Sequence, residues 1–105
     1  MIWPTSIRGE IYRELSKNLE GLAQDLEAFI DGRYEYKADD FAEWIPLFQD
    51  VIRFVPDNSQ LGNVLDELML WLQEFVDHFI EGDELIGHWL VRLRGLIRDC
   101  PYPLR

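Results

Sequence analysis

The chain has 105 residues, of which 48% are apolar, so it can bury the core of a single domain without disulfides or a structural metal. Cys100 is the single cysteine, which excludes an intrachain disulfide, and no apolar run is long enough to span a membrane. The formal net charge of −10 disfavours direct binding to nucleic acid or an anionic membrane, because their phosphates would be repelled.

The first predicted helix begins near Pro4, with Thr5 or Ser6 as its cap, and ends at Gly32, which can adopt the left-handed conformation of a helix end. No basic segment followed by an apolar stretch precedes it, so we expect no signal peptide and a cytoplasmic location. Apolar residues at steps of three or four predict a long amphipathic stripe: Ile7, Ile11, Leu15, Leu19, Leu22, Leu26, Phe29 and Ile30.

A second helix is predicted after the connector 33–38, with Asp39 or Asp40 as its cap and the turn 56–58 at its end. Pro46 lies inside its apolar pattern. Proline lacks the backbone donor, and its ring clashes with the preceding turn, so the helix is predicted to be kinked or broken at Pro46.

The third helix is predicted to begin at Asn58 or Ser59 and to end at Gly82, and Asp83 caps a fourth helix that runs towards Pro101. No stretch shows the alternation typical of a strand, so the expected fold is all-α. The third helix has a regular apolar seam at steps of four and three: Leu61, Leu65, Leu68, Leu72, Phe75 and Phe79.

Two segments of the chain, 22–32 and 72–82, are similar at an offset of fifty residues. A single helical hairpin cannot bury its apolar stripe alone, so two copies predict a four-helix bundle built from two similar hairpins. The first copy has five additional residues before Trp44-Ile45, which recurs as Trp89-Leu90. The other matching residues are Leu22, Phe29, Ile30 and Gly32, which recur as Leu72, Phe79, Ile80 and Gly82.

Enzyme motifs are absent: there is no glycine-rich phosphate loop, Cys-x-x-Cys, nucleophile elbow or His-Glu-x-x-His. No nucleophile, base and orienting partner can be assembled, so neither an enzyme nor a cofactor is predicted. His78 and His88 lie opposite the apolar stripes of their helices and are interpreted as exposed. Asp77 and Glu81 are one turn apart, but the Glu-x-x-His pattern of di-iron bundles is missing, so no metal site is predicted.

The acidic residues concentrate in the centre of the chain, where residues 18–84 hold seventeen of the twenty and three basic residues. Leu70 falls on the side of the third helix opposite its seam. An apolar residue among carboxylates is typical of an interface for a basic partner, with one desolvated anchor and surrounding charge that attracts the partner. The carboxylates assigned to this surface are Asp66, Glu67, Glu74, Asp77 and Glu81.

Two alternatives to this interface stay open. Single exposed leucines are ordinary, and acidity can serve solubility alone. The basic residues of the fourth helix, Arg92, Arg94 and Arg98, can also neutralise part of the acidity within the fold.

A second candidate contact surface lies in the first connector, which carries Tyr34 and Tyr36 and leads to Asp40. Extra length and aromatic side chains in a loop favour a contact surface, because function tends to lie on loops held by a rigid scaffold. The alternative is that the tyrosines cover the end of the bundle.

A helix that ends in Phe29-Ile30-Asp31-Gly32, followed by a loop, Asp40-Phe41 and Trp44, resembles small helical bacterial immunity proteins of the colicin D immunity type. The general likeness, which is a small, acidic, all-helical chain without a catalytic motif, covers the whole chain. The resemblance implies binding to the basic nuclease domain of a toxin and blockage of its active site by carboxylates. It carries over no individual inhibitory residue.

These observations predict a non-enzymatic protein-binding protein without cofactor or metal. Its most concrete version is an immunity protein that neutralises a basic toxin domain through an acidic surface. The alternative is a regulatory or adaptor subunit of a larger assembly, and an enzyme is disfavoured.

Overall fold

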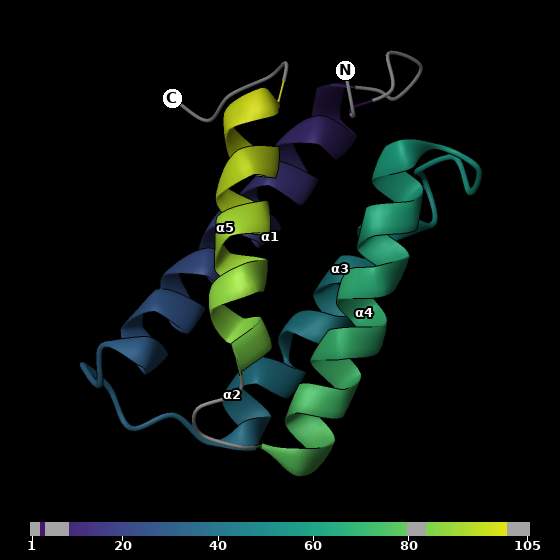
Figure 1. The fold of residues 1–105 in the computed structure, drawn as a ribbon. Coiled ribbons are helices and arrows are strands. Elements are labelled where there is room, and N and C mark those ends of the chain that lie inside the picture. Colours follow the sequence, from purple (N-terminus) through teal and green to yellow (C-terminus); the bar gives the residue numbers. More distant parts are fainter. Residues whose placement is uncertain (1–2, 4–8, 80–83, 101–105) are drawn as a thin grey trace.

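The computed structural model describes residue Trp3 and residues 9–79 and 84–100 (Figure 1). No strand occurs among them, which confirms the all-α prediction. No helix in these ranges is both long and apolar enough to cross a membrane. The described residues form five helices: α1 Gly9–Ile30, α2 Ala38–Ala42, α3 Trp44–Ile52, α4 Gln60–His78 and α5 Glu84–Asp99.

The predicted second helix is divided at Glu43 into α2 and α3. Pro46 is the third residue of α3, so the interruption lies three residues before the proline rather than at it. The proline ring conflicts with the carbonyl four residues earlier, which belongs to Ala42, and Pro46 has no N–H to donate to it. The proline therefore occupies the first turn of a new helix, where its missing donor costs little.

The helix starts agree with the prediction in one case and differ in another. Ser59 caps α4, since its Oγ accepts a hydrogen bond from the N–H of Gly62 at 3.0 Å. In contrast, the residue before α2 is Lys37, so Asp39 and Asp40 are not the caps. Asp40 acts from within the first turn, where its carboxylate accepts the backbone N–H of Lys37 at 2.8 Å. The predicted start of the first helix, near Pro4, lies outside the described residues.

The helix ends show a similar contrast. Gly32 follows α1 with a φ of 67°, as predicted. The prediction that Gly82 ends the third helix is wrong, because α4 ends at His78 and the left-handed residue is Phe79, with a φ of 37°. Positive φ is uncommon for a bulky residue. Here the Phe79 ring packs against Phe29 and Phe75, with ring centroids 5.5 and 5.6 Å apart, and this packing offsets the backbone cost. Gly82 and Asp83 themselves lie outside the described residues.

Helix α3 lies against both long helices, α1 and α4 (Figure 1). α1 packs against α5 and α3, whereas α4 packs against α2 and α3. The backbones of α4 and α5 make few close contacts, and the stacked rings of Trp71 and Trp89, 5.8 Å apart, bridge these two helices. Trp3 is attached to α5 by a hydrogen bond of 2.9 Å from its Nε1 to the carbonyl of Leu96.

Candidate protein-interaction surface

The outer side of α4 presents Leu70, whose side chain is 73% exposed. Leu68 and Leu72, on either side of it in the chain, are completely buried. The helical phase predicted from the apolar seam is therefore confirmed, and Leu70 is a large apolar side chain in contact with solvent.

Carboxylates lie around Leu70 on the same helix, and all of their side chains are exposed. Three of them are within one turn of Leu70 and the fourth is two turns away. Glu81, which was assigned to this surface, lies outside the described residues. We use the term α4 acidic face for Asp66, Glu67, Leu70, Glu74 and Asp77.

Part of this charge is paired inside the fold. Arg92 of α5 donates from Nη1 to Oε2 of Glu67 at 3.1 Å, and Gln73 donates from Nε2 to Oδ1 of Asp77 at 3.0 Å. In the ranges that the structure covers, no basic side chain forms an ion pair with Asp66 or Glu74. The Glu67–Arg92 pair is substantially exposed, so it contributes at most about 1 kcal/mol to stability. Glu67 can therefore exchange partners at little cost.

Of the described carboxylates on the α4 acidic face, Glu67 is the one neutralised by a basic residue of α5, which is Arg92. Arg94 pairs instead with α1, through Glu20 at 3.1 Å and Glu27 at 2.9 Å. These two carboxylates, with Glu27 first, raise the pKa of Arg94. The ion pairs of Arg94 hold α5 on α1, and the described basic residues leave most of the α4 acidic face uncompensated.

Of the three residues assigned to the connector surface, Tyr34 is exposed, whereas Tyr36 and Asp40 form hydrogen bonds within the fold. Tyr34 is 60% exposed, with its ring 4.8 Å from that of Tyr36. Tyr36 is half-buried and donates from Oη to Oδ1 of Asp25 at 3.0 Å. Burial, followed by this hydrogen bond to a carboxylate, raises the pKa of Tyr36 to about 12. Asp40 accepts a hydrogen bond from the backbone N–H of Lys37, so Tyr34 is the one side chain of the three that is largely exposed.

Two residues of α1 have structural roles that the sequence pattern did not reveal. Asp25 also accepts from Nε1 of Trp44 at 2.8 Å, so one carboxylate joins α1 to the connector and to α3. A Cβ at Gly21 would overlap the Trp44 ring, so glycine is needed there for close packing. Gly21 and Asp25 are one turn apart, and a glycine beside a carboxylate in an amphipathic helix is the signal that could have indicated this contact.

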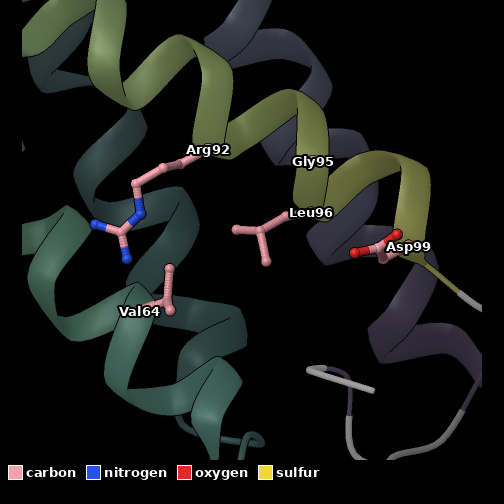
Figure 2. A pocket seen from close by; sticks show the side chains of 5 residues that line it. All are labelled: Val64, Arg92, Gly95, Leu96 and Asp99. Atoms are coloured by element: carbon pink, nitrogen blue, oxygen red, sulfur yellow. The ribbon is translucent and has the colours of Figure 1, made fainter.

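Neither of two pockets formed by described residues contains a catalytic arrangement. One, of about 510 Å³, runs along α1 beside Asp25, Arg33 and Arg94, but its arginines are paired with carboxylates of α1 and with Asp31. No cluster of three or more histidine, cysteine, aspartate or glutamate residues suited to a metal is found in this part of the chain. His78 and His88 are exposed, as predicted. The second pocket, of about 220 Å³, lies between α4 and α5 and is lined by Val64, Arg92, Gly95, Leu96 and Asp99 (Figure 2).

A comparison with known proteins found no matching family model, no matching curated protein and no matching solved structure. The interpretation of these surfaces therefore rests on their own chemistry. By exposure and charge, the α4 acidic face is the strongest candidate for a protein interface.

Proposed function

We propose that this chain is a non-enzymatic protein-binding protein and that its α4 acidic face binds a basic protein. The observation that carries this proposal is Leu70, 73% exposed among carboxylates, of which Asp66 and Glu74 have no ion-pair partner among the described residues. Removing a leucine side chain fully from water stabilises a complex by about 1.5–3 kcal/mol before other costs. The carboxylates attract a basic surface and favour rapid association.

The most concrete version of this function is immunity against a toxin. Acidic side chains on a rigid helix can occupy the surface with which a basic nuclease domain binds phosphates, and so block access of its substrate. The resemblance to small helical immunity proteins at Phe29-Ile30-Asp31-Gly32 and Phe41 supports this version. In the structure, Phe29 and Phe41 pack edge to face with centroids 5.5 Å apart, so the resembling residues support the fold rather than the interface.

A regulatory or adaptor subunit is the second candidate, and an additional exposed apolar surface favours it. Leu47 and Phe54, seven residues apart in and just after α3, are each about half exposed. A subunit that joins two partners needs two such surfaces, whereas an inhibitor needs one.

A pull-down from native lysate, with mass spectrometry, tests the proposal. The bait is compared with a variant that carries Asp66→Lys and Glu74→Lys. A matched control carries Glu14→Lys and Asp50→Lys, which reverse two exposed carboxylates on α1 and α3 and change the net charge equally. Recovery of a basic nuclease domain by the bait and the control, but not by the α4 variant, supports immunity. Recovery of a large stable assembly that is insensitive to the α4 changes favours the subunit.

We also infer that the fold is a four-helix bundle made from two similar hairpins, in which α2 and α3 together correspond to α5. Phe29 and Phe79, which are fifty residues apart, are both half-buried and in ring contact. Trp44 packs against Gly21 of α1, and Trp89 stacks on Trp71 of α4. Each of these tryptophans therefore contacts the long helix of its own hairpin. Superposition of residues 9–30 and 38–52 on residues 60–78 and 84–99 tests this inference.

A further inference from the structure

The pocket between α4 and α5 is an apolar groove with a charge at each end. Val64 of α4 and Leu96 of α5 project into the space between the helices, with Arg92 at one end and Asp99 at the other (Figure 2). Because Arg92 and Asp99 are seven residues apart in α5, the groove extends about 10 Å along that helix. This length accommodates one or two side chains of a bound segment.

Gly95 opens this groove at a cost to α5. Glycine inside a helix is destabilising by about 0.5–1 kcal/mol relative to alanine. Close packing explains the cost at Gly21 and Gly62, where a Cβ would collide with the Trp44 ring and the Pro56 carbonyl. At Gly95 a Cβ would have only one atom within 4 Å, the Arg98 Nη2 at 3.9 Å. Packing within the described fold therefore does not require glycine at this position.

At one end of the groove, Arg92 is held in place by contacts with Trp89 and with Glu67 of the α4 acidic face. The Arg92 guanidinium lies 4.3 Å from the centroid of the Trp89 ring while it pairs with Glu67. Glu67 of the acidic face is thus joined by an ion pair to Arg92, which lines the groove. At the other end, Asp99 is exposed and has no ion-pair partner among the described residues. An occupant therefore meets an apolar floor with free carboxylates at Asp99 and along α4.

We propose that this groove receives an apolar side chain from a basic amphipathic helix of the partner. The inference rests on the proposed function and names the binding site of the partner's apolar residue. A lysine or arginine next to that residue binds Asp99, and another on the same helix reaches Glu74. Insertion of an amphipathic helix into a groove is a common mode of peptide recognition.

The test compares Gly95→Leu with Gly87→Leu. Gly87 lies in the same helix, does not line the groove, and has nothing within 4 Å of an added Cβ. Leucine is a better helix former than glycine, so both variants should unfold at or above the wild-type temperature. The probe is a synthetic amphipathic helix of lysine and leucine, followed by fluorescence anisotropy. We expect Gly95→Leu to weaken binding about tenfold or more, which corresponds to about 1.4 kcal/mol, and Gly87→Leu to leave it unchanged.

Further measurements separate failure of the groove from failure of the proposed function. On wild-type protein, the probe should shift the amide resonance of Gly95 and leave that of Gly87 in place. If the probe binds wild type and Gly95→Leu equally, with the same salt dependence, the proposal that the groove is the binding site is wrong. The proposal that the α4 acidic face binds a basic protein is then not contradicted. If a helix of glutamate and leucine binds as well as the basic probe and is blocked by Gly95→Leu, the basic partner is overturned. Absence of binding by both helices contradicts both proposals.

Discussion

At the scale of single residues, the fold depends on which side of each helix an apolar side chain occupies. Leu68 and Leu72 are buried while Leu70 is exposed, although all three lie within one and a half turns of α4. The chemistry of the three side chains is identical, so their different environments can be compared directly by substitution.

Truncation of these leucines should separate the core from the surface. Leu68→Ala and Leu72→Ala should each lower the free energy of unfolding by about 2–5 kcal/mol, because each leaves a cavity in the core. Leu70→Ala should lower it by less than about 0.5 kcal/mol, as is usual for surface positions. Urea unfolding of the three variants measures this. A loss at Leu70 equal to the other two would contradict its placement on the solvent side.

Tyr36 gives a pH-dependent prediction. Its folded pKa of about 12 lies above the ordinary value of 10, so folding favours the protonated phenol. The stabilisation is complete below pH 10 and is lost as the pH rises from 10 towards 12. Unfolding free energies measured across this range should fall more steeply for wild type than for Tyr36→Phe.

Asp25→Asn should lower the pKa of Tyr36 only in part, since burial is the larger cause of the raised value. The absorbance of tyrosinate, followed as the pH is raised, measures this pKa.

At the scale of helices, periodicity was sufficient for the buried faces but not for the boundaries. Apolar steps of three and four locate the faces of α1 and α4, because burial follows directly from helical geometry. The break at Glu43, before Pro46, and the end of α4 at Phe79, before Gly82, depend on contacts between helices. A local pattern does not contain these contacts, which include the aromatic cluster that holds Phe79 in a left-handed conformation.

The same limit applies to the candidate site. The exposure of Leu70 and of its surrounding carboxylates follows from the phase of one helix and was predictable. The pairing of Glu67 with Arg92, and the groove between α4 and α5, arise from two helices that the chain brings together. The connector tyrosines could be located in the sequence, but the bond from Tyr36 to Asp25 required the tertiary structure.

The helical glycines provide a prediction at this scale. Gly21→Ala should destabilise the fold by about 1–3 kcal/mol, because its methyl group overlaps the Trp44 ring and forces a rearrangement. Gly95→Ala should stabilise it by about 0.5–1 kcal/mol, since the added methyl group meets open space and improves helix propensity. Thermal melts measure both effects: a stabilising Gly21→Ala would show that the contact between α1 and α3 is misplaced, and a destabilising Gly95→Ala would show that the space beside Gly95 is not open.

At the scale of the whole molecule, the charge of −10 is compensated unevenly. Among the described residues, Arg33 and Arg94 pair with carboxylates in and just after α1, whereas α4 receives one ion pair, from Arg92. The uncompensated field on α4 lies next to the groove between α4 and α5. Long-range attraction and short-range anchoring are therefore located on neighbouring surfaces, and kinetics can separate their effects.

If the α4 acidic face binds a basic partner, association and dissociation should respond to different substitutions. Asp66→Lys and Glu74→Lys should slow association, and added salt should do the same, because screening is strong beyond about 10 Å at 0.1 M ionic strength. Leu70→Ala should accelerate dissociation, since an anchor desolvated after docking stabilises the complex rather than the encounter. Surface kinetics with the recovered partner measure both rates. Binding that is indifferent to salt and to all three substitutions would show that this face is only solvated, and the exposed Tyr34 would become the next surface to test.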